Sequence, residues 1–311
     1  MRSELTSICD VPGIRVGHAQ NETAKTGCTV ILPEKGAVAG VDVRGSAPGT
    51  REIEAIKLAR LVPSIHAVLL AGGSAFGLDA AGGVQQYLEE RGIGFDMWVA
   101  RVPVVPSAVI FDLHEGDASV RPDKKMGMQA ALAASQDAKC MGRIGVGCGA
   151  TVGKVLGIEH CMKGGIGSAC RQVGECRVGA LVVVNAFGDI VDDKTGRTLA
   201  GARDPKSGKF LDTEEYIQAL RGIASAASPG NTTLAVVATD AGFNKEETTK
   251  IAQMAQDGFA RAIRPAHTLF DGDLIIGLSV GDKHENCLAV GTSAADMVAA
   301  AIVSAVRAAN A

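Results

Sequence analysis

Charge of one sign is what this sequence most clearly lacks. Its 311 residues carry 31 Lys and Arg against 34 Asp and Glu, a formal net charge of −3, and no block of like charge stands out. Aromatic residues make up only 4% of the chain, with a single tryptophan, Trp98. We therefore expect no nucleic-acid partner held by a basic or base-stacking surface, and no membrane surface bound by charge.

Long hydrophobic runs are also missing. The N-terminal stretch MRSELTSICDVPG lacks the apolar segment of a signal peptide. No run of 18 or more uncharged apolar residues occurs, and the most apolar helical segment, 294–306, contains Asp296. The sequence therefore predicts no membrane span and a cytoplasmic protein.

Metal-ligand spacing is absent as well. The eight cysteines include no CxxC pair, and the six histidines include no HxH or HxxxH pair. This pattern indicates reduced thiols in the core or at the surface, and it does not favour a zinc site.

Glycine, by contrast, is abundant at 39 residues, and short apolar runs alternate with helical segments. Runs rich in Val, Ile and Leu predict strands at 28–32, 37–43, 66–71, 178–185, 233–239 and 274–279. Several are apolar throughout, which indicates burial on both faces. Helices are predicted at 51–61, 76–91, 245–263 and 293–308, and a long surface loop at 189–212. The mixture predicts a layered α/β or α+β fold in a single domain, residues 1–311.

Two glycine-rich loops are candidates for phosphate binding, but the spacing of their glycines does not match that of known phosphate-binding loops. Gly72 and Gly73, with Ser74, follow a predicted strand without forming GxGxxG. The loop GVGCGATVGK at 145–154 lacks the glycine spacing of a Walker A motif, and it has Val155 in place of the magnesium-binding hydroxyl. Close packing at turns explains both loops; alternatively, their backbone N–H groups surround a catalytic centre.

Two carboxylates flank a glycine in HTLFDGDLIIGLS, residues 267–279. Asp-Gly favours a tight turn, which is one explanation of Asp271 and Asp273. The alternative is functional: one carboxylate holds an amine or hydroxyl at the end of a strand, and the other balances a lysine, for which Lys154 is the candidate. A DxD pair can also bind a metal, but the sequence offers too few further carboxylates nearby.

The stretch GNTTLAVVATDA, residues 230–241, places Asn231 and Thr232 directly before an apolar run. A turn entering a strand explains this pattern by itself. The alternative is self-cleavage: the Thr232 hydroxyl attacks the preceding carbonyl, water hydrolyses the resulting ester, and the freed threonine keeps its own α-amino group as a base. Such an amine has a pKa of about 7.7–8.0 in model compounds, which suits a nucleophile activated near neutrality.

With HTLFDGD further on, GNTTLAVVATDA resembles the self-cleaving L-aminopeptidase/D-esterase family, whose relatives include β-aminopeptidases and the nylon-oligomer hydrolase. The resemblance runs from near residue 10 to the end of the chain. The other segments that carry it are PGIRVGH (12–18), TGCTVILPEKG (26–36), DVRGSAPGTRE (42–52), HAVLLAGGSAFGLDAAGGV (66–84), PSAVIFD (106–112) and RPDKKMG (121–127).

The resemblance implies an α+β fold, a four-layer αββα sandwich similar to the N-terminal-nucleophile hydrolases but with different connectivity. It implies self-cleavage between Asn231 and Thr232 into fragments 1–231 and 232–311, and further assembly of these αβ heterodimers into a homo-oligomer. It implies neither a metal nor an organic cofactor.

The same resemblance assigns site residues. Thr232 would be the nucleophile, and in the nylon-hydrolase branch Lys154 matches a catalytic lysine, Asn185 an active-site asparagine, and Asp271 and Asp273 an acidic pair. These types fit the chemistry. An amide at the end of a strand can donate to an oxyanion, a lysine lowers the cost of deprotonating a hydroxyl, and carboxylates orient an amine.

For the substrate, we expect the loop Gly72, Gly73, Ser74 and the side chain of Phe111 to line the pocket. Some relatives have Tyr at Phe111, so any role of a phenolic hydroxyl is lost here. The expected activity is release of the N-terminal residue from small peptides, or hydrolysis of amino-acid amides and esters, through an acyl-enzyme on Thr232. The alternatives are an acyltransferase of the ornithine-acetyltransferase type and a non-cleaving binding or structural protein on the same scaffold.

Overall fold

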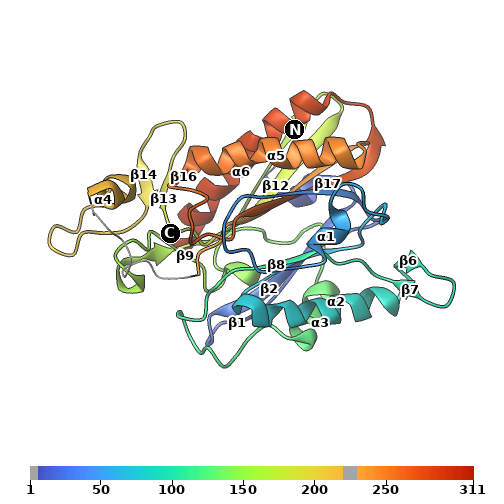
Figure 1. Cartoon of the computed structure of the whole chain (residues 1–311), viewed down its shortest axis with the longest axis horizontal. Helices are drawn as coiled ribbons and strands as arrows, with labels where there is room; N and C mark the ends of the chain where they lie inside the picture. Colours follow the sequence, from blue (N-terminus) through green and yellow to red (C-terminus); the bar gives the residue numbers. More distant parts are fainter. Residues whose placement is uncertain (1–5, 220–229) are drawn as a thin grey trace.

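Two five-stranded sheets lie face to face, and a pair of helices covers the outer side of each (Figure 1). The computed structural model describes residues 6–219 and 230–311. The predicted four-layer αββα sandwich is confirmed. The helices of the outer layers are α2 (Ala80–Glu89) and α3 (Lys124–Leu132) on the first sheet, and α5 (Lys245–Ala262) and α6 (Cys287–Ala309) on the second.

The first sheet has the strand order β1-β2-β5-β8-β4. All neighbours are antiparallel except β5 and β8, which run parallel. Its strands are β1 (Ile14–Asn21), β2 (Thr26–Pro33), β5 (Val68–Ala71), β8 (Ser107–Val109) and β4 (Thr50–Arg51).

The second sheet repeats this pattern in the order β11-β12-β15-β17-β3, with β15 and β17 as its parallel pair. Leu234, the first residue of β15, is paired with Leu274, the first residue of β17. Residues that precede these two strands therefore lie close together, where the two strands begin. The strands are β11 (Gly165–Val173), β12 (Cys176–Val184), β15 (Leu234–Ala241), β17 (Leu274–Lys283) and β3 (Val38–Val43).

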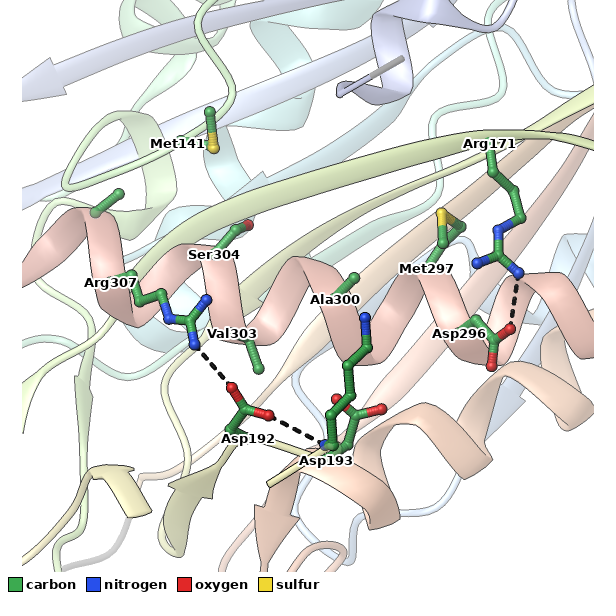
Figure 2. A pocket seen from close by; sticks show the side chains of 12 residues that line it. Met141, Arg171, Asp192, Asp193, Asp296, Met297, Ala300, Val303, Ser304 and Arg307 are labelled. Carbon is green, nitrogen blue, oxygen red and sulfur yellow. Dashed lines mark hydrogen bonds and ion pairs between the residues drawn. The ribbon is translucent and has the colours of Figure 1, made fainter. Parts of the chain in front are cut away.

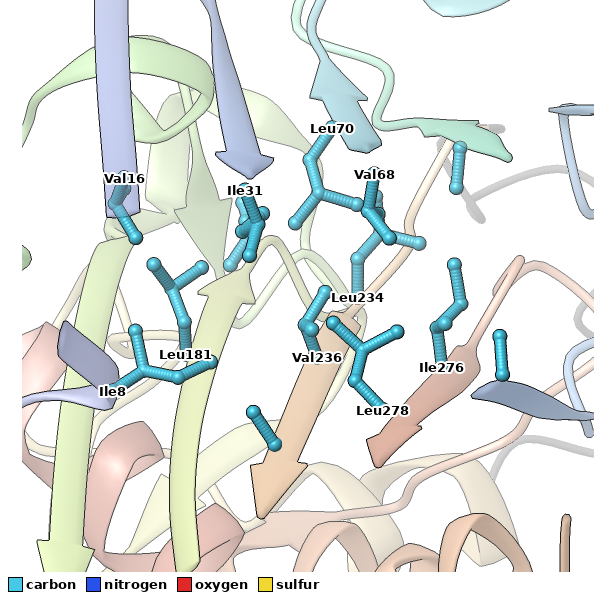
Figure 3. Packing of buried hydrophobic residues seen from close by; sticks show 14 of the residues in the cluster. Ile8, Val16, Ile31, Val68, Leu70, Leu181, Leu234, Val236, Ile276 and Leu278 are labelled. Atoms are coloured by element: carbon cyan, nitrogen blue, oxygen red, sulfur yellow. The ribbon is translucent and has the colours of Figure 1, made fainter. Parts of the chain in front are cut away.

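The side chains of β15 show why its sequence is apolar throughout. Successive side chains of a strand point to opposite faces. Leu234 and Val236 point into the core between the two sheets (Figure 3). Ala235 and Val237 pack in the separate cluster beneath α5 and α6. Burial on both faces, expected from the apolar runs, is thus confirmed for this strand, all of whose residues are buried.

The predicted helix at 51–61 is wrong. The structure has only a single turn there, α1 (Ile53–Ile56), preceded by strand β4. Glu52 and Ala59 both have φ of 57°, in the left-handed region, which interrupts a right-handed helix on either side of that turn. The predicted helix at 76–91 also differs at its start, because residues Ser74–Asp79 form a 3₁₀ helix before α2 begins.

Helix α6 is longer than predicted. It begins after Asn286, whose side chain accepts the N–H of Leu288 as an N-cap, and it runs for 23 residues. By length and composition alone it would pass for a membrane-crossing segment, but 56% of its apolar 18-residue stretch is buried inside the protein. It packs against α5, β11 and β12, as the core helix of a folded domain does.

The predicted loop at 189–212 contains two short strands. Buried Ile190 and Val191 pair with 198–200, and the polar turn between the strands matches the prediction. Figure 1 shows this excursion at one end of the molecule and the β6–β7 hairpin at the other. The remaining elements are β13 (Asp189–Val191), β14 (Thr198–Ala200), β16 (Ile263–Arg264), β6 (Phe95–Asp96), β7 (Arg101–Val102), β9 (Thr151–Val152), β10 (Met162–Lys163), α4 (Thr213–Ala219), and the 3₁₀ turns Ile8–Asp10, Gly145–Gly147 and Ile158–His160.

Candidate active site

Adjacent strand ends bring the predicted catalytic residues together. Thr232 lies just before β15, and Asp273 immediately precedes the parallel neighbour β17. Asn185 directly follows β12, which pairs antiparallel with β15, so it lies where β15 begins. Lys154 arrives from the loop after β9, where its N–H donates to the carbonyl oxygen of Phe187 at 2.9 Å. Each of the four is buried.

The peptide bond between Asn231 and Thr232 is held on both sides. The Thr232 hydroxyl donates to the carbonyl oxygen of Asn231, the residue before it. The same carbonyl oxygen accepts the N–H of Gly272 at 2.9 Å, and the N–H of Thr232 donates to the carbonyl oxygen of Asn185 at 2.9 Å. The nucleophile candidate, the carbonyl it would attack and a donor to that carbonyl are therefore in contact.

Asn185 connects three segments through its side chain. Its Oδ1 accepts the N–H of Thr151 at 3.0 Å and Nζ of Lys154 at 2.9 Å. Its Nδ2 donates to the carbonyl oxygen of Phe111 at 3.2 Å. The side-chain amide is thus placed at the centre of the site, and in the intact chain one of its N–H groups is bound to Phe111.

Lys154 is completely buried, and its ammonium is held by Asn185 rather than by a carboxylate. Nζ donates to both Oδ1 and the carbonyl oxygen of Asn185, at 2.9 and 3.1 Å. Burial lowers its pKa to about 8, while the nearby Cys161 and Asp271 act in the opposite direction. A lysine of this kind exchanges its proton close to neutral pH, which is typical of functional lysines.

Asp271 is buried against backbone donors. Its Oδ1 accepts the N–H of Phe187 at 3.3 Å, and its Oδ2 accepts the N–H of Thr268 at 2.9 Å. Burial raises the pKa of Asp271 to about 6, and the negative charge of Asp273 is the second largest contribution to this shift. A carboxyl of this kind changes its charge just below neutrality.

Each carboxylate oxygen of Asp273 accepts hydrogen bonds from a different residue. Its Oδ1 accepts the N–H of Thr233 at 2.7 Å. Its Oδ2 accepts two donors from His267, the backbone N–H at 3.1 Å and the ring Nδ1 at 2.9 Å. The oxygens of the DxD pair are therefore occupied by protein groups.

A cavity of about 310 Å³ opens beside Thr232. The residues of its wall that the structure describes are all uncharged and partly apolar, which suits an uncharged acyl group. It is lined by Ala47, Pro48, Gly49, Ser74, Ala75, Val109, Ile110, Phe111, Gly230, Asn231, Thr232 and Phe270.

Of the four residues predicted to bind substrate, Phe111 and Ser74 line this cavity, whereas Gly72 and Gly73 are not among the lining residues that the structure describes. The N–H of Gly73 donates to Oδ1 of Asp112 at 2.6 Å, and those of Gly72 and Ser74 donate to backbone carbonyls. These N–H groups are thus used in shaping the loop.

Three contributors were missed by sequence reasoning. The N–H of Gly272 and the carbonyl of Phe270, which accepts the N–H of Asn231 at 3.3 Å, are backbone groups and leave no side-chain signature. The buried carboxyl of Asp112, whose pKa burial raises to about 6, closes the PSAVIFD segment, and that position was the available signal.

A larger cavity, about 560 Å³, lies alongside α6, away from these residues (Figure 2). Two ion pairs lie in its wall: Arg171 binds Asp296 at 2.8 Å, and Arg307 binds Asp192 at 2.7 Å. None of the predicted site residues lines it. Size therefore does not identify the site here, whereas the convergence around Thr232 does.

Comparison with known proteins identifies the family of the chain. Residues 6–311 match the model of peptidase family S58. A protein of Mycobacterium tuberculosis, described as an uncharacterized aminopeptidase, is 41% identical over 333 residues, covering 97% of this chain and 94% of the relative. The 6-aminohexanoate-oligomer endohydrolase of a Kocuria species is 32% identical over 316 residues, covering 96% of this chain and 85% of the relative.

Among solved structures, the L-aminopeptidase D-Ala-esterase/amidase of Ochrobactrum anthropi superposes with a TM-score of 0.72 over 99% of this chain and 89% of its own. At 19% identity this likeness concerns the fold, which is described for that protein as a new variant of the Ntn hydrolase fold. Sequence and structure together lead to one conclusion: the chain belongs to peptidase family S58 and is an enzyme of the aminopeptidase or amidase type.

Proposed function

We propose that the protein is a self-processing hydrolase whose nucleophile is Thr232, exposed as an N-terminal residue when the chain cuts itself after Asn231. The observation that carries the proposal is the contact between the Thr232 hydroxyl and the carbonyl of Asn231, with the N–H of Gly272 on the same carbonyl oxygen. A nucleophile, an electrophile and an oxyanion donor meet at one buried bond.

The cut follows in two steps. Oγ1 of Thr232 adds to the carbonyl carbon of Asn231, and the N–H of Gly272 stabilises the charge that develops on the carbonyl oxygen. The C–N bond breaks as the nitrogen takes up the proton that the hydroxyl has lost, which leaves an ester and a free α-amino group. Water then hydrolyses the ester, giving a carboxylate on Asn231 and a free hydroxyl on Thr232.

The mature enzyme would repeat this chemistry on a substrate in the adjoining cavity. The α-amino group of Thr232 accepts the hydroxyl proton as Oγ1 bonds to the acyl carbon of an amide or ester. The C–N or C–O bond of the substrate then breaks, and the departing amine or alcohol takes that proton. Water hydrolyses the acyl-enzyme, which releases the carboxylic acid and restores the hydroxyl. Lys154 and Asn185 stabilise negative charge, and Asp271 and Asp273 hold the amine and the strand behind it. The uncharged residues described in the cavity wall favour small peptides and amino-acid amides or esters with uncharged acyl residues.

Intact mass spectrometry of the denatured protein tests the proposal. We expect two species split between Asn231 and Thr232, the smaller of them roughly a quarter of the 31.8 kDa chain. Thr232→Ala should stay whole and inactive, because only a hydroxyl or thiol can start the acyl shift. Thr233→Val is the matched control, since the buried Thr233 hydroxyl finds no partner among the described residues. A processed or active Thr232→Ala protein would refute the nucleophile.

An acyltransferase using the same acyl-enzyme is the second candidate, because the cavity residues that the structure describes do not distinguish water from an amine as the acceptor. Supplying an acyl donor together with a free amine, and identifying the product, separates the two. The proposal also includes assembly of the cut pairs into a homo-oligomer, which light scattering of the processed protein would measure.

A further inference from the structure

His267 touches Asp273 twice and has no part in the chemistry described so far. We propose that His267 is a positioning residue: through Asp273 it fixes the backbone of Thr233, and thereby the hydroxyl of Thr232, for both self-cleavage and substrate hydrolysis. This inference rests on the proposed function and adds a residue to it.

The geometry around Asp273 divides its two oxygens between two tasks. Both donors of His267, its backbone N–H and Nδ1, bind Oδ2, at 3.1 and 2.9 Å. This leaves Oδ1 for the N–H of Thr233 at 2.7 Å. The carboxylate is buried, so no solvent competes for either oxygen. A carboxylate clamped on one side cannot rotate freely, and its second oxygen becomes a fixed acceptor.

His267 adopts an unusual backbone conformation to make both contacts. Its φ is 57°, in the left-handed region that residues other than glycine seldom adopt. Conformations of this kind persist where the surrounding contacts over-determine them, and they cluster at functional sites. The neighbouring Thr268 turns its N–H onto Asp271 at 2.9 Å, so one short segment serves both carboxylates.

Only one nitrogen of the ring is used. A carboxylate oxygen accepts hydrogen bonds, so Nδ1 carries the proton in this contact. Nε2 is buried with no hydrogen-bond partner among the described residues, and the ring packs on Phe259 with centroids 5.7 Å apart. The ring therefore acts on the site through Nδ1 and Asp273, without a hydrogen bond to Thr232 itself.

Thr233 transmits this order to the nucleophile. Its N–H is held by Asp273, and its carbonyl oxygen accepts the N–H of Leu274 at 3.3 Å. Both contacts come from the segment that begins β17, so the first residues of β15 are fixed from one side. Thr232 is the residue before Thr233. A small shift of Thr233 therefore moves the hydroxyl of Thr232 away from the Asn231 carbonyl.

The test uses the fact that asparagine and glutamine place their amide nitrogens differently. In His267→Asn the side-chain Nδ2 takes the place of Nδ1, whereas in His267→Gln the amide reaches the place of Nε2. His267→Phe keeps the ring and removes both nitrogens. Self-cleavage of each chain is followed after cell-free synthesis, and kcat and KM of the matured protein are measured on aminoacyl p-nitroanilides.

We expect His267→Gln and His267→Phe to slow self-cleavage and lower kcat by about 10- to 100-fold, because a displacement of about 1 Å costs this much. KM should change little in these two variants. In His267→Asn the rate of self-cleavage and kcat should both stay within about threefold of the original protein. Equal rates for the Asn and Gln variants, or a loss confined to KM, would overturn the inference. Comparing His267→Asn with His267→Gln tests the inference even if the His267→Phe protein does not fold.

Failure of the inference is distinguishable from failure of the proposed function. If Thr232→Ala is still cut or active, the nucleophile itself is wrong, whatever the His267 variants do. If Thr232→Ala is dead and the His267→Phe chain matures and turns over like the original protein, only the role of His267 is wrong.

Discussion

Gly230 lies directly against the side chain of Phe111. A Cβ at position 230 would lie 2.3 Å from Cγ of Phe111, and Gly230 has φ of 101°. Gly230→Ala should therefore push the chain away from the cavity wall just before the bond to be cut. We expect self-cleavage to slow by at least about tenfold, which the rate of fragment formation measures.

Gly13→Ala provides the control for that variant. Gly13 has a comparable φ of 86°, but a Cβ there would meet nothing within 4 Å. It carries the backbone strain without the clash at Phe111. If both variants slow self-cleavage equally, strain alone is responsible, and the contact with Phe111 has no part in positioning the bond.

The burial of Lys154 predicts a pH-dependent stability. Its folded pKa of about 8 lies below the ordinary value of 10.5. Between these values the unfolded chain binds more protons, so the free energy of unfolding rises with pH across this window. The gain is at most about 3 kcal/mol, and it should be missing in Lys154→Met.

Denaturant unfolding from pH 7.5 to 10.5 checks this, with both proteins carrying Thr232→Ala so that each remains a single chain. The difference in the free energy of unfolding between the two should grow with pH in favour of Lys154. A difference independent of pH would contradict the lowered pKa.

The acid side of the activity should report Asp271. Its pKa of about 6 means that it is charged above that pH and neutral below it. The α-amino group of Thr232, whose pKa is about 7.7–8.0 in model compounds, sets a first fall in kcat of about tenfold per pH unit. We expect protonation of Asp271 to steepen this fall below pH 6, to about a hundredfold per pH unit. In Asp271→Asn kcat should be lower throughout, and the steeper limb below pH 6 should vanish. A variant that keeps the steeper limb would assign it to another group.

Removing the side chain of Asn185 should affect turnover and the alkaline side of the profile. Asn185→Ala deletes the amide donor and should lower kcat by about 10²- to 10³-fold if that donor serves the oxyanion. It also removes Oδ1, an acceptor for the Lys154 ammonium, so the pKa of Lys154 should fall below 8. Steady-state kinetics across pH measure both effects. A change in KM alone would assign Asn185 to substrate binding.

The sequence predicts the second sheet better than the first, for a physical reason. Strand β15 is buried on both faces and is therefore apolar at nearly every position, which makes 233–239 unmistakable. Strand β1, by contrast, lies at a sheet edge, is only half-buried, and contains His18, Gln20 and Asn21. It was not predicted, because an edge strand need not carry a continuous apolar pattern.

The site divides in a similar way. Side chains with a distinctive chemistry, such as Lys154 and Asp271, were named from their motifs, and the fold places them together. Backbone donors such as the N–H of Gly272 could not be named, because every residue except proline has one. His267 begins the segment HTLFDGD, but its contact with Asp273 depends on a left-handed backbone conformation that composition does not reveal.

The position of β15 and β17 has a consequence for a molecule cut after Asn231. Both strands would belong to the smaller piece, yet they lie inside the second sheet, between β12 and β3 of the larger piece. The pieces would stay interleaved by backbone ladders on two sides, so they would part only on unfolding. Refolding would then require two separate polypeptides to find each other, a step that depends on concentration and competes with aggregation. The uncut chain would be the form that folds, and the enzyme it becomes would persist through the slowness of its unfolding.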